Sequence, residues 1–279
     1  MSVLLALLSS VLWGTSDFLG GTATRRLPGA SVVVVSQFVA LLGLLPLAAV
    51  TGAFGTPTAY VLPAVLAGLV GTTALGAFYT ALATGTMGVV APIASLGIVL
   101  PVAVGLAQGE TPRTLQVLGI VVAVAGVVLA SGPELAGRAG LRPLLLAAFA
   151  AAGFGTVVVL VARASRGETG AVVMTLLTMR LTSVVVLATV LAATRRRTLG
   201  VQRCDLVLLA AVGIGDVAAN GSYALASRGA LLSVVAVLSS LYPVVTVLLA
   251  RQLHAERLRP VQGVGVGVAL AGVVLLAGG

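Results

Sequence analysis

The chain has 279 residues, of which 59% are hydrophobic and 8% are charged, and its net charge is +9. Soluble globular proteins carry about 25% charged residues, so this composition predicts an integral membrane protein. All sixteen basic residues are arginine. The absence of lysine excludes a GxxxxGK[ST] phosphate loop and a retinal Schiff base. A single cysteine, Cys204, and a single histidine, His254, allow neither an internal disulfide nor a His/Cys metal cluster, and we expect no metal and no cofactor.

Ten long apolar segments follow one another with only short loops between them. Their approximate bounds are 2–22, 31–51, 59–83, 87–107, 115–131, 141–162, 170–193, 206–227, 231–251 and 261–278. They are continuous and about 20 residues long, which predicts membrane-spanning helices rather than barrel strands. The first segment lacks a basic n-region and contains Asp17, so it is predicted to be a retained helix and not a signal peptide. The expected fold is an all-α integral membrane protein with ten transmembrane helices. We expect this multi-pass protein to contact the lipid bilayer and to bind no nucleic acid.

The second half of the chain repeats the first. Gly14-Thr15 recurs as Gly155-Thr156 at an offset of 141, and Gln37 aligns with Arg180 at an offset of 143. Near the ends of the two halves the offset grows to 146, as between Glu110 and Glu256. This pattern predicts two units, residues 1–132 and 139–279, with five helices each. An odd number of helices inserts the two units in opposite directions, which is the inverted-repeat architecture of secondary transporters.

The arginine distribution predicts how the chain is oriented. The loops after the first, fifth, seventh and ninth segments hold eleven arginines, and those after the fourth, sixth and eighth hold four. Because arginine-rich loops stay in the cytoplasm, this count places both termini outside.

Three charged residues lie well inside the apolar segments: Asp17, Arg180 and Asp216. Arg180 and Asp216 lie near the middle of consecutive segments, and consecutive helices are usually neighbours. Because an isolated charge is costly at that depth, we predict an Arg180–Asp216 ion pair. The pair either contacts substrate or is a structural clamp between two helices.

The segment 206–227 has one polar face. Asp216, Asn220 and Tyr223 recur on it at helical spacing, and Tyr79 occupies the position of Tyr223 in the first half. This face predicts one wall of a substrate cavity, to which Gln37 is added as the counterpart of Arg180. The alternative for both tyrosines is a hydroxyl that bonds a backbone carbonyl.

Asp17 is the candidate for a coupling proton or for a cationic substrate group. The first segment has no basic residue to pair with it. Trp13, a candidate substrate-binding residue, lies on the same helix face one turn earlier. The alternative is a carboxyl that bonds backbone or the loop from Thr22 to Arg25.

Prolines are expected to open the helix backbone in the membrane. Pro92 and Pro101 lie in the segment 87–107, and Pro243 lies in the segment 231–251. Freed carbonyls at broken helices commonly mark binding sites in transporters. Nearby hydroxyls make Ser239 and Tyr242 further substrate-binding candidates. Ser95 and Ser240 also lie close by, and all these serines rank below the charged residues because serines often bond their own turn.

Two further features are given structural roles. Glu110 and Glu256, at matching helix ends, are predicted to be caps or interfacial pairs. Gly263 and Gly267 form a GxxxG pattern that lets helices approach closely, either within the bundle or at a homodimer seam, so the expected state is a monomer or a homodimer.

The motifs together resemble a known family. Trp13-Gly14, Gly109-Glu110 before Leu118-Gly119, and Ala271-Gly272-Val273 are similar to motifs of EamA-type members of the drug/metabolite transporter superfamily. The resemblance covers nearly the whole chain. It implies a ten-helix plasma-membrane carrier that moves small metabolites or drugs, often outward, with cytoplasmic termini, in contrast to the arginine count. The chain departs from the family pattern at Ala255, where the family usually has glycine, and at Gly97, which aligns with Pro243.

The hypothesis is a secondary carrier of small organic solutes that works by alternating access, and not an enzyme. Arg180 favours solutes that bear a carboxylate, such as amino acids, because a guanidinium binds carboxylates bidentately. An uncoupled facilitator or channel-like permease is the first alternative. A membrane-embedded enzyme is disfavoured, because the sequence offers no clustered base, nucleophile or metal site.

Overall fold

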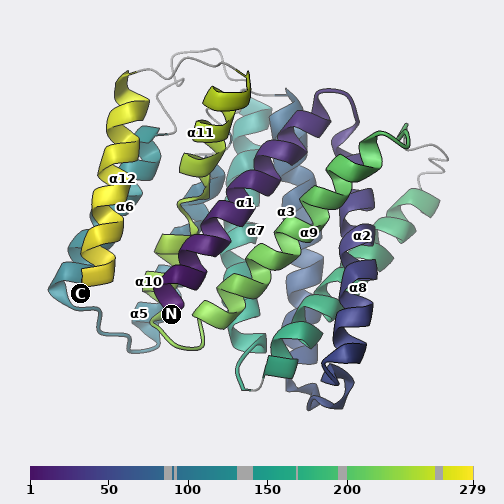
Figure 1. The fold of residues 1–279 in the computed structure, drawn as a ribbon, viewed down its shortest axis with the longest axis horizontal. Coiled ribbons are helices and arrows are strands. Elements are labelled where there is room, and N and C mark those ends of the chain that lie inside the picture. Colours follow the sequence, from purple (N-terminus) through teal and green to yellow (C-terminus); the bar gives the residue numbers. More distant parts are fainter. Residues whose placement is uncertain are drawn as a thin grey trace.

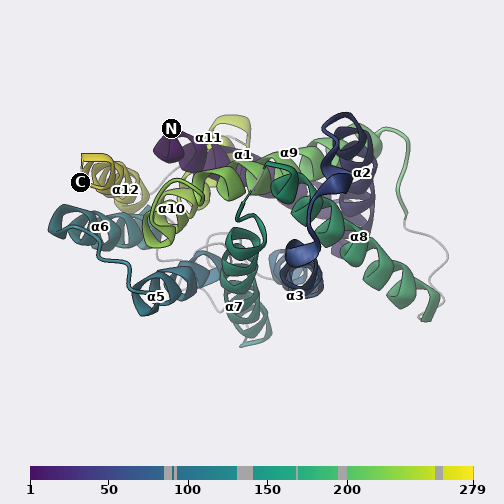
Figure 2. The same cartoon turned by 90° about the horizontal axis from the view of Figure 1, so that it is seen from below.

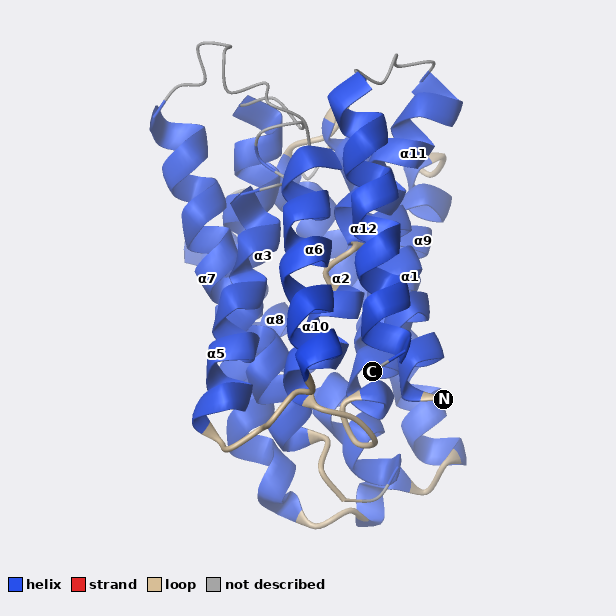
Figure 3. Cartoon of the chain, turned by 90° about the vertical axis from the view of Figure 1, so that its left-hand side faces the viewer, coloured by secondary structure: helices blue, strands red, loops and turns tan. Residues whose placement is uncertain are grey.

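A computed structural model describes residues 1–84, 90, 93–130, 141–167, 169–193, 200–254 and 260–278. Within these ranges the regular secondary structure is helical (Figure 3). The first half contains α1 (Ser2–Thr24), α2 (Gly29–Val50), η1 (Ala53–Gly55), η2 (Thr58–Tyr60), α3 (Val61–Thr84), η3 (Leu96–Ile98), α5 (Val99–Ala107) and α6 (Thr114–Ala130). The second half contains α7 (Leu141–Ala164), α8 (Thr169–Ala193), α9 (Asp205–Ala226), α10 (Leu232–Ser239), α11 (Tyr242–His254) and α12 (Pro260–Gly278).

The long helices coincide with the apolar segments expected from the sequence. Six of them, α1, α2, α3 with η2, α7, α8 and α9, are long and apolar enough to cross a membrane. Shorter apolar helices cover Ile93–Ala107, Thr114–Gly126, Leu232–Thr246 and Gly263–Leu276, which are parts of the other four expected segments. The all-helical membrane fold is therefore confirmed, and the count of ten spans stays a prediction.

Helices of one half pack mainly against helices of the other (Figures 1 and 2). α1 lies along α9, and α3 lies along α7. In the internal repeat, α1 corresponds to α7 and α3 corresponds to α9. The pair α1–α9 is therefore equivalent to the pair α7–α3 when the two halves are exchanged. The pairs α2–α8 and α6–α12 map onto themselves. Both chain ends lie at the same end of the bundle (Figure 1).

Prolines interrupt two helical segments, as expected. Pro243 is the second residue of α11, and the helix is broken between Ser239 and Tyr242. In the first half the helix tightens to 3₁₀ geometry over Leu96–Ile98, four residues before Pro101. Proline has no N–H, so Pro101 cannot bond the Gly97 carbonyl and Pro243 cannot bond the Ser239 carbonyl. Pro92 lies outside the described residues.

Glycines let a neighbouring helix reach each of these interruptions. A Cβ on Gly14 of α1 would lie 2.5 Å from the Tyr242 carbonyl oxygen, where α11 begins. A Cβ on Gly155 of α7 would overlap the Gly97 carbonyl oxygen in the same way. Gly14 and Gly155 are the aligned pair of the internal repeat, so matching residues occupy matching places in the two halves.

The small-residue faces of α6 and α12 differ in what they contact. Gly126 and Gly119 of α6 and Gly272 of α12 leave no room for a side chain between the two helices. In contrast, a Cβ on Gly263 or Gly267 would meet no described atom within 4 Å. Contact of the Gly263–Gly267 face within the bundle is therefore not seen among the described residues, and a homodimer seam stays a prediction. The reason is that α12 turns its Gly272 face, and not its Gly263 face, toward α6.

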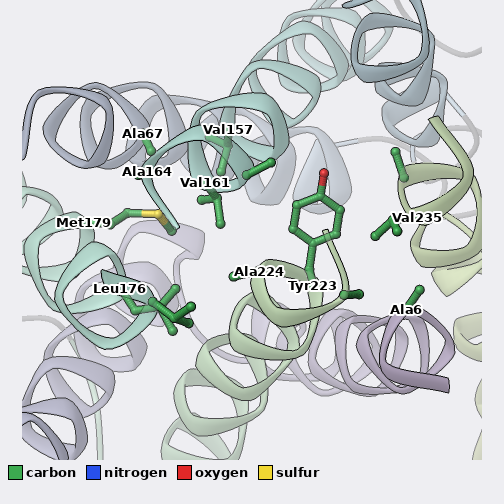
Figure 4. Close-up of a cluster of buried hydrophobic side chains, with 14 of the residues drawn as sticks. Ala6, Ala67, Val157, Val161, Ala164, Leu176, Met179, Tyr223, Ala224 and Val235 are labelled. Atoms are coloured by element: carbon green, nitrogen blue, oxygen red, sulfur yellow. The ribbon is translucent and has the colours of Figure 1, made fainter. Parts of the chain in front are cut away.

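The largest cluster of buried apolar side chains lies where the two halves meet. Tyr223 of α9 is fully buried, among Ala6 of α1, Val161 of α7 and Val235 of α10 (Figure 4). Many leucines and valines on the outer faces are exposed, among them Leu62, Val121 and Val264. Apolar side chains on both sides of the helices are what a bundle surrounded by lipid requires.

Candidate functional site: a polar cavity between the halves

A cavity lies between the two halves of the chain. It encloses about 930 Å³ of space free of protein atoms, including open space at its mouth. Residues of both halves form its walls, from α1, α2, α3, α7, α8, α9, α10 and α11 and from the segment around η3. Eight of the sequence-predicted residues line it: Trp13, Asp17, Gln37, Arg180, Asp216, Asn220, Ser239 and Tyr242.

The predicted ion pair is present in the cavity wall. The Arg180 guanidinium donates from Nη2 to Asp216 Oδ2 at 2.5 Å. The Arg180 side chain is 3% exposed and that of Asp216 is 24% exposed. Asp216 thus presents part of its carboxylate to the cavity, whereas the arginine lies behind it.

The Asp216 carboxylate is held by three donors. Besides Arg180, the Trp13 indole donates from Nε1 to Oδ1 at 3.1 Å, and Asn220 Nδ2 donates to Oδ1 at 3.0 Å. Asn220 also bonds the Asp216 backbone carbonyl, which fixes the amide one turn along α9. The polar face of α9 and Trp13 of α1 therefore form one network that keeps the carboxylate in place.

Gln37 completes the environment of Arg180. Its Oε1 accepts a hydrogen bond of 2.6 Å from Arg180 Nη1, and both side chains are buried. These two residues are aligned in the internal repeat, so their contact joins equivalent positions of the two halves. Arg180 Nε is buried without a partner among the described residues. A guanidinium whose Nε–H is unused remains able to bind a further acceptor.

Asp17 lies in the same cavity and has a different environment. Its side chain is partly exposed, and among the described residues no hydrogen bond or ion pair to it is found. The alternative of a bond to the loop from Thr22 to Arg25 is not seen there; Thr22 instead donates to the Phe18 carbonyl. Asp17 is therefore a second carboxyl in the cavity, apart from the Asp216 network.

The two matched tyrosines do not line the cavity. Tyr79 is buried against α1, where a Cβ on Gly20 would lie 2.8 Å from its Cζ. Tyr223 packs against Trp13 with ring centroids 5.9 Å apart and the rings tilted by 38°. Its hydroxyl has no partner among the described residues. The alternative of a hydroxyl bonded to a carbonyl is thus not seen for Tyr223. A substrate-binding role for either tyrosine stays a prediction.

Some cavity residues were missed by the sequence reasoning. Phe154 of α7 lines the wall and packs edge-on against Phe78 at 5.5 Å. Its alignment with Trp13 in the repeat could have identified it. Ser183 and Met179 flank Arg180 on the same face of α8 and also line the cavity. In an apolar helix, neither stood out. The searched residues contain no group of three or more His, Cys, Asp or Glu side chains that could hold a metal ion.

Comparison with known proteins agrees with this architecture. A model of the EamA-like transporter family matches the chain twice, over residues 1–132 and 141–278. No curated protein matches the chain by sequence. Among 29 matching solved chains, one entitled "Crystal structure of protein" has a TM-score of 0.76 at 20% identity, with 98% of this chain and 95% of that chain covered. At this identity the likeness shows the fold, and the printed title names no activity.

Proposed function

Since this chain belongs to the EamA-like transporter family, and so is a membrane transporter of small solutes, we propose that it is a secondary carrier that exports its solute across the plasma membrane by alternating access. The observation that carries this proposal is the buried Arg180, held between Gln37 and Asp216 at the wall of a cavity shared by both halves. Two observations support inverted repeats of five helices over residues 1–132 and 139–279. The helix pairs are equivalent when the halves are exchanged, and Gly14 and Gly155 make matching contacts.

Carboxylate-bearing solutes, such as amino acids, are the first class to test. Two nitrogens of Arg180 are occupied by Gln37 and Asp216, and Nε is unused. A solute carboxylate would therefore bind at the unused Nε–H and compete with Asp216 for the charge of the guanidinium. Because Trp13 and Asn220 also bond Asp216, they set how readily this exchange occurs.

Proton antiport through Asp17 would supply the energy for export. This carboxyl lines the cavity and is outside the ion-pair network. A carboxyl that is exposed in turn to the two sides of the membrane can carry a proton in one direction while the solute moves in the other. Binding of the solute at Arg180 and of the proton at Asp17 would then alternate in one cavity.

The test uses proteoliposomes that contain a pH-sensitive dye and an imposed proton gradient. Pools of amino acids, nucleosides, sugars and organic cations are added in turn. We expect one pool to collapse the gradient. Asp17→Asn should abolish the proton flux and leave solute counterflow in place. Arg180→Ala and Asp216→Ala should each abolish both.

Two outcomes would contradict parts of the proposal. Solute flux without proton flux in the unmodified chain would leave an uncoupled facilitator. Undiminished transport by both Arg180→Ala and Asp216→Ala would exclude the ion pair from the transport site.

A further inference from the structure

Glu110 bonds a helix of the opposite half. Its Oε1 accepts from Leu232 N at 2.5 Å and its Oε2 accepts from Ser233 N at 3.0 Å. These are the first two N–H groups of α10, and they have no acceptor within their own helix. The sequence-based expectation of a cap is thus confirmed, but the capped helix lies 122 residues away. Its counterpart, Glu256, lies outside the described residues.

The backbone before Glu110 fixes where its carboxylate lies. Helix α5 ends at Ala107, and Gly109, two residues beyond, has a φ of 87°. Glu110 N donates to the Gly105 carbonyl, and Gly109 N donates to the Leu106 carbonyl. This is a Schellman motif, and its left-handed residue favours glycine. The chain then turns back, and the Glu110 carboxylate lies directly against Gly105, where a Cβ would overlap it.

The bonds of Glu110 lie at the start of α10, where buried side chains separate the cavity from the end of the bundle, and we call this region the closed end. The cavity is lined by Ala236, Ser239 and Ser240, farther along α10. Between this wall and Glu110 lie the first residues of α10, among which Ser233 and Val235 are at most 1% exposed. Tyr223 is fully buried beside Trp13 and Val235 (Figure 4). This end also holds Ser2 of α1, which lies against Gly229.

The closed end contains polar groups whose bonding is incomplete. The Tyr223 hydroxyl and Ser233 Oγ are buried and have no partner among the described residues. Both hydroxyls would gain partners if water entered. The carboxylate–amide bonds of Glu110 favour the closed arrangement, while these hydroxyls favour an open one. An element with opposing contributions of this kind can adopt two arrangements of similar free energy.

We propose that Glu110 is the latch that closes the cavity at the end of the bundle where the chain begins, through its bonds to the start of α10. This inference rests on the proposed alternating access. Opening of that end requires α5 and α10, which belong to different halves, to separate. The two bonds from the Glu110 carboxylate must then break, and the N–H groups of Leu232 and Ser233 must bind water instead.

The test measures accessibility and needs no known solute. Cys204, the only cysteine, is replaced by serine, and Ala236→Cys reports from the α10 wall of the cavity. A maleimide that cannot cross the bilayer is added to either side of cells and inside-out vesicles. Gln108→Cys, an exposed position beside Glu110, identifies the side of the latch. From this side the unmodified latch should keep Ala236→Cys labelling slow.

Two variants disturb the latch independently. Glu110→Gln removes the charge and leaves a single acceptor oxygen, and Gly105→Ala displaces the carboxylate while keeping its charge. Each should raise labelling from the latch side roughly tenfold and lower it from the other side, since charge-assisted bonds favour one state by about that factor. Asp205→Asn is the matched control, because Asp205 also accepts a backbone N–H, from Gln202, at the opposite end of α9. It should change neither rate.

Unchanged labelling from the latch side in both Glu110→Gln and Gly105→Ala would overturn the proposal. A rise from both sides in both variants would also overturn it, because that is general loosening and not a shift between two states. Solute flux separates this result from failure of the proposed function. If transport persists while labelling does not respond, the latch is wrong and the carrier proposal stands.

Discussion

Arg180 carries the only positive charge found deep in an apolar helix among the described residues, and every described interaction of its guanidinium serves to compensate that charge. Asp216 neutralises it, and Gln37 supplies an acceptor from the opposite half. A buried ion pair adds little to stability compared with a well-packed apolar pair, but removal of one partner is costly. The arrangement therefore constrains which single substitutions the bundle tolerates.

Asp216→Asn should destabilise the protein by roughly 3–5 kcal/mol, because the buried guanidinium loses its counter-charge. Arg180→Gln should be destabilising as well, and the double variant should recover much of the loss. The apparent melting temperature in detergent measures all three. A double variant no more stable than the worse single variant would show that the two charges do not compensate each other.

At the scale of helices, close approach depends on a few glycines. Gly126 of α6 faces Ala269 of α12, and a Cβ on Gly126 would lie 2.5 Å from the Ala269 Cα. Gly267, on α12 itself, has open space at the position of its Cβ among the described residues. The two positions allow the same substitution to be compared inside and outside one helix pair.

Gly126→Leu should separate α6 from α12 and lower stability by about 1–3 kcal/mol or more, the cost of overpacking a tight contact. Gly267→Leu should change stability by only a few tenths of a kcal/mol, about the effect of an exposed substitution. The melting temperatures of the two variants in detergent distinguish these effects. Unfolding is detected as the loss of the monodisperse peak in size-exclusion chromatography after heating. Equal losses would mean that the Gly267 face is also covered, as at a homodimer seam.

For the whole molecule, the sequence predicted contacts between residues at the same depth in consecutive helices. It did not predict which helices of the two halves pack side by side. Arg180 and Asp216 are at equal depth in consecutive segments, and their ion pair was predicted correctly. The partner of Glu110 could not be found this way, since Leu232 and Ser233 come close only when the halves are assembled. For the same reason the sequence left open whether the Gly263–Gly267 face of α12 meets the bundle or a second copy, because a GxxxG pattern does not specify which neighbour it meets.

The orientation of the molecule is a prediction that a native residue can test. Cys204 is exposed, and it precedes α9, which runs to the end of the bundle where Gly229 lies against Ser2. Gln108 is at that second end, since Arg166 beside α7 bonds it and Glu110 bonds α10. The arginine count places the Cys204 end in the cytoplasm. The family resemblance implies the reverse.

In intact cells, an impermeant maleimide should therefore leave Cys204 unlabelled until the membrane is permeabilised. In the variant Cys204→Ser with Gln108→Cys, it should label the new cysteine at once. The reverse pattern would place both termini in the cytoplasm. It would also show that the arginine count does not determine which loops face the cytoplasm. Because the two sites lie at opposite ends of one bundle, a single orientation must label one and protect the other. Labelling of both in intact cells would indicate a chain inserted in two orientations, which the imbalance of eleven arginines against four opposes.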